Sequence, residues 1–76
     1  MSAKKRVWLV ELINATDRQD DEVWSVRAST AAEAKSTADD SVTSRFTLGR
    51  AVPARGGTKA QKALAREFRS YCVRSL

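Results

Sequence analysis

The longest apolar run of the chain lies within RVWLVELINA, residues 6–15. Alternate side chains of an extended backbone point to opposite faces. One face here carries Trp8, Val10 and Leu12, and the other carries Val7, Leu9 and Ile13. A strand that is apolar on both faces is typically central and covered on each side, or covered on one side with a binding patch on the other.

A hairpin is predicted after this strand, because the polar segment TDRQDDE at residues 16–22 contains residues that suit turns. Its acidic cluster lacks the glycine and the bidentate glutamate of a calcium loop, so we favour a solvated turn over a metal site. The cluster consists of Asp17, Asp20, Asp21 and Glu22. Residues 23–29 then alternate, which predicts a second strand antiparallel to the first. We expect Trp24, Val26 and Ala28 to face inward and Val23, Ser25 and Arg27 to face outward.

A capping box, Thr30 with Glu33, predicts the start of a helix with small alanines at helical spacing. Asp39 and Asp40 oppose the helix dipole and predict its end. Residues 44–52 return to extended character, with Phe46, Leu48, Arg50 and Val52 expected on one face. A right-handed crossover places this third strand beside the first, in the order 2-1-3.

A second capping box, Thr58 with Gln61, follows Pro53 and a short linker, and we expect its helix to run to Val73 or beyond. The predicted inner side carries Ala60, Leu64, Phe68, Tyr71 and Cys72. The opposite side is a basic ridge of Lys59, Lys62, Arg66 and Arg69. Together these patterns predict one small α+β domain over residues 1–76, with residues 1–5 frayed. Its expected order is ββαβα, with two helices on a three-stranded antiparallel sheet.

Charge is divided unevenly along the chain, whose formal net charge is +5. Residues 1–44 hold six basic and eight acidic side chains, a balance of −2, and residues 45–76 hold eight basic ones against Glu67, a balance of +7. This asymmetry favours a polyanionic partner. The residues predicted to bind a partner or nucleic acid are Arg50, Arg55, Lys59, Lys62, Arg66 and Arg69. The ridge remains open to three interpretations: contact with phosphates, contact with an acidic protein, or an ordinary solvated helix face.

Two interpretations also stay open for the segment around Gly56, Gly57 and Thr58, which is either a linker before a capped helix or a phosphate site. The chain has no histidine and the single cysteine Cys72. The commonest general base and the commonest metal ligand are therefore missing, and we expect neither an enzyme nor a bound metal or cofactor. The lone cysteine and the lack of a membrane span or signal sequence predict a cytoplasmic protein.

The segment VRASTAAEAKSTA, residues 26–38, is preceded by the strand WLVELI and followed by the third predicted strand, and it resembles the ninth family of type I-F anti-CRISPR proteins. Ala28, Thr30, Ala34, Lys35 and Ala38 carry the likeness, which covers about half of the chain, whereas the helix from Thr58 onward departs from the family pattern. The resemblance implies a phage-encoded inhibitor that docks on a host CRISPR surveillance complex such as Cascade and blocks target DNA binding.

Three functions are therefore carried forward from the sequence. The first is this non-enzymatic inhibitor of a host nucleic-acid machine, and the alternative is a direct DNA- or RNA-binding accessory protein. A third is self-association through Val7, Leu9 and Ile13. Monomer and dimer both remain open.

Overall fold

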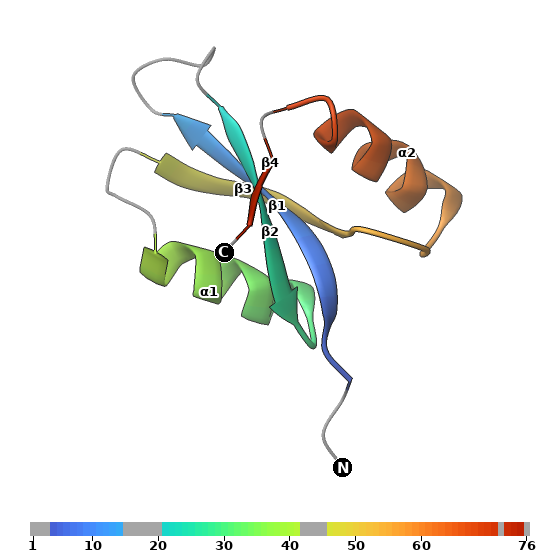
Figure 1. The fold of residues 1–76 in the computed structure, drawn as a ribbon, viewed down its shortest axis with the longest axis horizontal. Helices are drawn as coiled ribbons and strands as arrows, with labels where there is room; N and C mark the ends of the chain where they lie inside the picture. Colours follow the sequence, from blue (N-terminus) through green and yellow to red (C-terminus); the bar gives the residue numbers. More distant parts are fainter. Residues whose placement is uncertain (1–3, 15–20, 42–45, 72, 76) are drawn as a thin grey trace.

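The computed structural model describes residues 4–14, 21–41, 46–71 and 73–75. Within these residues the elements follow the order ββαβαβ, and Figure 1 shows the sheet lying between the two helices. They are β1 (Arg6–Asn14), β2 (Glu22–Ala28), α1 (Ala31–Ser41), β3 (Phe46–Pro53), α2 (Lys59–Phe68) and β4 (Val73–Ser75). The predicted α+β class, the two helices and the order of the first five elements are confirmed.

The sheet has the strand order β3-β1-β2-β4. β1 pairs antiparallel with both β2 and β3, so the predicted order 2-1-3 is confirmed. The prediction of a three-stranded antiparallel sheet is wrong, because β4 adds a fourth strand that runs parallel to β2 and makes the sheet mixed.

The added strand exists because α2 ends earlier than predicted. The helix stops at Phe68, and the Ser70 and Tyr71 amides donate to the carbonyls of Glu67 (3.1 Å) and Phe68 (3.0 Å). The Ser70 hydroxyl also donates to the Glu67 carbonyl at 2.6 Å. Each of these hydrogen bonds joins residues three positions apart, which is the tighter spacing of a 3₁₀ turn, and they close the last turn of the helix. The chain is then free to place β-branched Val73 in a strand, where such side chains are favoured.

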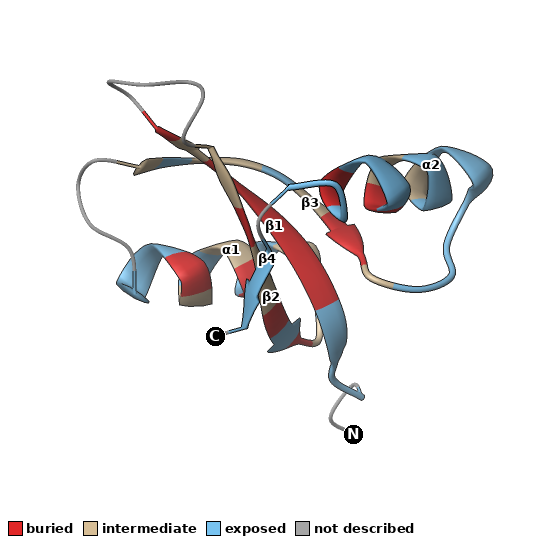
Figure 2. Ribbon diagram, turned by 45° about the horizontal axis from the view of Figure 1, so that its top comes forward, coloured by how far each residue is buried: buried red, intermediate tan, exposed pale blue. Residues whose placement is uncertain are grey.

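From Trp8 onward β1 is largely buried, with α1 on one face and α2 on the other, whereas its first residues are exposed (Figure 2). The strand is therefore central and mostly covered, but Val7 at its start remains 38% exposed. Val23 was expected to face outward, but only 1% of its surface is exposed. It belongs to the second face of the sheet, where α2 covers it together with Leu9 and Val52.

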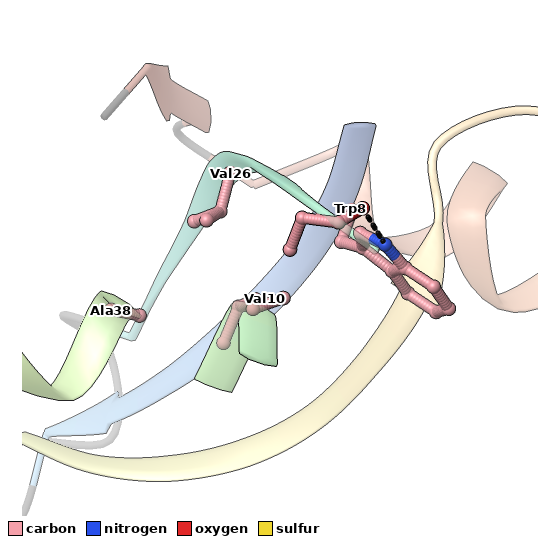
Figure 3. Close-up of a cluster of buried hydrophobic side chains, with 6 residues drawn as sticks. Trp8, Val10, Val26 and Ala38 are labelled. Atoms are coloured by element: carbon pink, nitrogen blue, oxygen red, sulfur yellow. Dashed lines mark hydrogen bonds between the residues drawn. The ribbon is translucent and has the colours of Figure 1, made fainter. Parts of the chain in front are cut away.

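The α1 face contains Trp8, Val10 and Val26, packed on the alanines of the helix (Figure 3). Ala34 and Ala38 are fully buried, and their small side chains let the helix approach the strands closely. The indole Nε1 of Trp8 donates to the Ala28 carbonyl at 3.0 Å, so burial of the ring leaves no unpaired polar atom there.

The α2 face contains Leu9, Val23 and Val52 of the sheet and Ala65 and Phe68 of the helix, with Leu64 half-buried beside them. Ala60, which was expected on the inner side of α2, is exposed. The inner side is instead centred on Ala65 and Phe68, because the helix ends before Tyr71 and packs by its last turns.

A β-bulge in β3 changes the predicted faces of that strand. Val10 pairs with Ala51 but Leu12 pairs with Leu48, so the single residue Glu11 lies opposite two residues, Gly49 and Arg50. An extra residue of this kind shifts the alternation of side chains. Leu48 therefore packs on the α1 side and Val52 on the α2 side, and the prediction that they share a face is wrong.

Both predicted capping sites lie at helix starts. The Glu33 amide donates to the Thr30 hydroxyl at 3.1 Å, and the Glu33 carboxylate accepts from the Ser29 amide at 3.3 Å. At α2 the reciprocal pair is complete, with the Gln61 amide donating to the Thr58 hydroxyl (3.1 Å) and the Thr58 amide to the Gln61 side-chain oxygen (2.7 Å). Neither helix of the described residues is long and apolar enough to cross a membrane.

Candidate polyanion-binding site

The basic ridge of Lys59, Lys62, Arg66 and Arg69 lies at the exposed flank of α2 and its C-cap. Helical residues advance by about 100° each, which places these four side chains within about a quarter turn. The same geometry places Glu67 on the opposite flank of the helix from Lys62 and Arg69. The ridge therefore presents positive charge alone toward one side of the molecule.

Arg50 is separated from this ridge by its partner. Its Nε and Nη2 atoms each donate to a Glu11 carboxylate oxygen at 3.2 Å, and its backbone amide donates to Glu11 Oε1 at 3.3 Å. The guanidinium also lies over the Phe68 ring, 5.4 Å from its centroid. Arg50 thus pairs with a buried acid and covers the end of the core, and its charge is less available to a ligand than those of the ridge.

The Glu11–Arg50 pair shifts the titration of both groups. Hydrogen bonding from the Arg50 side chain is the main cause that lowers the pKa of Glu11, and burial acts in the opposite direction. The pKa of Arg50 is raised, chiefly by the same hydrogen bonding to Glu11. Gly49 makes room for the pair, because a Cβ atom at this position would lie 2.4 Å from Glu11 Oε1.

Part of the ridge faces a small hollow beside the β3–α2 loop, with a volume of about 300 Å³. Its lining consists of Ala54, Arg55, Gly56, Lys62, Ala65, Arg66 and Arg69. Four of these seven residues are basic and none is acidic. The structure thus brings Arg55 together with Lys62, Arg66 and Arg69, and it places Lys59 outside the hollow at the start of α2.

A larger groove of about 670 Å³ adjoins the small hollow and shares Ala54, Arg55 and Arg69 with it. The remaining lining residues are Arg6, Val7, Leu9, Ser25, Val73 and Ser75. Arg6 was not among the predicted site residues. The signal for it was the basic run of Lys4, Lys5 and Arg6, which leads into β1 next to the end predicted to be frayed, residues 1–5.

Two arginines hold the β3–α2 loop against the sheet. Arg6 Nη2 donates to the Arg55 carbonyl at 2.8 Å, and the Arg69 guanidinium donates to the Ala54 carbonyl. The Ala54 amide in turn donates to the Val7 carbonyl at 2.9 Å. The loop and the cations around it are therefore fixed relative to β1. By contrast, the side chains of Lys62 and Arg66 make no ion pair or hydrogen bond within the described part of the chain and are exposed.

No acidic side chain among the described residues lines the small hollow or the larger groove. Glu11 is held by Arg50, and Glu22 forms an ion pair with Arg74 at 2.6 Å. Neither Glu11, Glu22 nor Glu67 lines the groove or the hollow. An anion that approaches from this side meets guanidinium and ammonium groups without competition from a neighbouring carboxylate.

The glycines before α2 serve the helix cap. Gly56 and Gly57 have φ angles of 74° and 85°, a region that favours glycine. A Cβ atom on Gly57 would lie 2.3 Å from Gln61 Oε1, the atom that caps the Thr58 amide. The Thr58 hydroxyl and the Gln61 amide are likewise used by the cap. This arrangement favours the linker before a capped helix over a dedicated phosphate site.

The acidic turn is only partly described, because Asp17 and Asp20 lie outside the described residues, as does Cys72. Asp21 accepts a hydrogen bond from the Asn14 amide at 2.8 Å, which ties the start of β2 to the end of β1. Among the residues that the structure describes, no group of three or more potential metal ligands gathers.

No known protein family, curated protein or solved structure matches the chain. Its function is therefore inferred from the chemistry of its own surface.

Proposed function

We propose that this chain is a non-enzymatic protein that binds the phosphate backbone of a nucleic acid on its basic hollow. The observation that carries the proposal is the gathering of Arg55, Lys62, Arg66 and Arg69 around one concave surface that no described acid lines. Lys59 extends the same positive flank along α2. A cytoplasmic setting, where nucleic acids are accessible, belongs to the proposal.

The physical basis is counterion release. Each phosphate that a basic side chain neutralises frees condensed cations, so affinity falls steeply as salt rises. Lys62 and Arg66 are suited to this role because they are exposed and have no intramolecular partner within the described residues. Arg50 is expected to contribute less, because Glu11 neutralises it.

A second candidate is the phage inhibitor that the resemblance implies, with docking on a CRISPR surveillance complex in place of direct nucleic-acid binding. What supports it is the sequence likeness over residues 26–38, since buried alanines such as Ala34 and Ala38 are expected of any helix packed closely on a sheet. Such an inhibitor would present the same basic flank to the surface or groove that receives target DNA. The two candidates differ in whether a protein partner is needed.

Fluorescence anisotropy with labelled single-stranded and duplex DNA tests the first candidate. For about four phosphate contacts, raising salt from about 50 to about 200 mM should weaken binding by about 100-fold. Lys62→Glu and Arg66→Glu should each weaken binding by at least about tenfold at low salt. Lys35→Glu, on α1 across the sheet, makes the same charge change and should have a much smaller effect.

Equal losses for Lys35→Glu and Arg66→Glu would contradict binding at the hollow. If the protein binds no nucleic acid alone, co-migration with a purified type I surveillance complex and loss of target cleavage would support the inhibitor. Absence of binding in both experiments would exclude both candidates.

A further inference from the structure

The face of the sheet that carries α2 is covered only in part. The helix packs on β3 and on the adjoining part of β1, and Ala65 and Phe68 share a buried cluster with Leu9, Val23 and Val52. Beyond this cluster, beside Ser25 and along β4, the same face stays open, and the exposed fractions of Val7 and Val73 are 38% and 40%. The open part is the floor of the larger groove.

Strand pairing shows how this floor is built. Ser25 of β2 lies beside Leu9 of β1 on one side and beside Ser75 of β4 on the other. Val7 lies one row along the sheet, next to Arg27, which is exposed on the same face. The floor is therefore mostly aliphatic, with two hydroxyl groups.

The rim of the groove is cationic. Arg6, Arg55 and Arg69 line it, and none of the lining residues is acidic. Two of these arginines use part of their guanidinium groups to hold the β3–α2 loop, which fixes their positions at the rim. The three arginines gather at the β3–α2 loop, so the apolar floor has cations along that border. Such a surface fits a ligand in which a flat apolar part is joined to anionic groups.

We infer that the larger groove binds a single-stranded segment of nucleic acid, with an unpaired base on the exposed side chains of Val7 and Val73 and the adjoining phosphates on the arginine rim. This inference rests on the proposed nucleic-acid binding and specifies its substrate class. Duplex nucleic acid keeps its bases paired and stacked, so it offers no base to this floor, whereas single strands can splay theirs onto protein surfaces.

If charge alone decided the affinity, the protein would prefer duplex over single-stranded nucleic acid. A duplex has the higher charge density and the larger counterion-release term per contact, so a surface that recognises only phosphates favours the duplex. No aromatic ring lines the groove among the described residues, so the base would contact aliphatic side chains and guanidinium planes. Tighter binding of single strands therefore reports on the floor specifically.

The test measures anisotropy of three probes with one sequence of about 12 nucleotides, within the usual site size of single-strand-binding domains. The probes are single-stranded DNA, single-stranded RNA and duplex DNA. We expect at least one type of single strand to bind about tenfold or more tightly than the duplex. The double variant Val7→Thr/Val73→Thr keeps β-branched shape and strand propensity but makes the floor polar.

This variant should lose about fivefold affinity for the preferred single strand and none for the duplex. The control Ala60→Ser changes an exposed residue of α2 outside the groove and should leave all three affinities unchanged. Equal or tighter binding of the duplex, or equal losses for both forms in the double variant, would overturn the inference and leave the proposed function intact. Salt-insensitive or absent binding of all three probes would instead overturn the proposed function.

Discussion

Among the described residues, Glu11 is the only acidic or basic side chain that is buried. Three hydrogen bonds from Arg50 compensate for the lost hydration of its carboxylate. Breaking such a pair by removing one partner is more costly than the modest net contribution of the pair itself, because the remaining group loses its compensation. The bulge in β3 is what brings Gly49 and Arg50 together opposite this residue.

Gly49→Ala should therefore destabilise the fold by about 1–2 kcal/mol, because the added Cβ would displace the Glu11 carboxylate from Arg50. Urea unfolding of a double-mutant cycle checks this explanation. In a Glu11→Ala background the obstacle is gone, and Gly49→Ala should be nearly neutral there. Equal losses in both backgrounds would show that the carboxylate is not the cause.

The lowered pKa of Glu11 also predicts a dependence of stability on pH. Because the pKa is lower in the folded state than its ordinary value of 4.5, folding favours the ionised form. The stabilisation is complete above pH 4.5 and is lost as the pH falls through the lowered folded-state pKa. Urea unfolding at about pH 6 and about pH 3 should show a smaller acid-induced loss for Glu11→Gln than for the wild type. Identical losses would contradict the prediction.

At the scale of the elements, the cap of α2 has a measurable role. Thr58→Ala should reduce the free energy of unfolding by about 1 kcal/mol, because the Gln61 amide loses its acceptor. Thr58→Ser keeps the hydroxyl and serves as the matched control, with stability close to that of the wild type. Chemical denaturation of the two variants provides the comparison, and an alanine variant as stable as the serine one would rule out the cap as a stabilising feature.

The elements that sequence predicted well are those with local signals. Alternation of side chains between the two faces of an extended chain identified β1 and β2, and Pro53 marked the end of β3. Both helix starts were identified by capping boxes, in which a threonine precedes a glutamate or a glutamine by three residues. The end of α2 was missed because its basic and apolar spacing continues past Phe68, whereas the Ser70 hydrogen bonds that close the helix depend on the folded backbone. The bulge was missed because it arises from pairing between β1 and β3, which are far apart in the chain.

In the candidate site, as in the fold, features with a local sequence pattern were predicted and features that depend on tertiary contacts were not. The basic ridge followed from helical spacing alone, and three of its members line the hollow together with Arg55. The separation of Arg50 from the ridge depends on its tertiary contact with Glu11, and the placement of Arg6 depends on the β3–α2 loop folding back on β1. Both are contacts across more than thirty residues of chain, for which the sequence carries no local pattern.

At the scale of the whole molecule, β1 joins two cores that do not share a face. Trp8 and Trp24 lie on the α1 side, and Phe68 is fully buried on the α2 side. Because alternate residues of the same strand belong to the two cores, neither core is complete without β1. A domain of this size usually unfolds in one cooperative step. Loss of packing on one face should therefore lower the unfolding midpoint of both cores together.

Phe68→Leu tests this coupling, because it removes volume from the α2 side and leaves the α1 side untouched. We expect a loss of about 1–2 kcal/mol, within the usual range for a reduced core side chain. Tryptophan fluorescence, which reports on the α1 side, and far-ultraviolet circular dichroism should shift to the same lower urea midpoint. Ala60→Ser, outside both cores, controls for nonspecific effects of substitution in α2. A tryptophan transition that stays at the wild-type midpoint while the helical signal shifts would mean that α2 unfolds separately, and that the groove it borders opens without loss of the remaining fold.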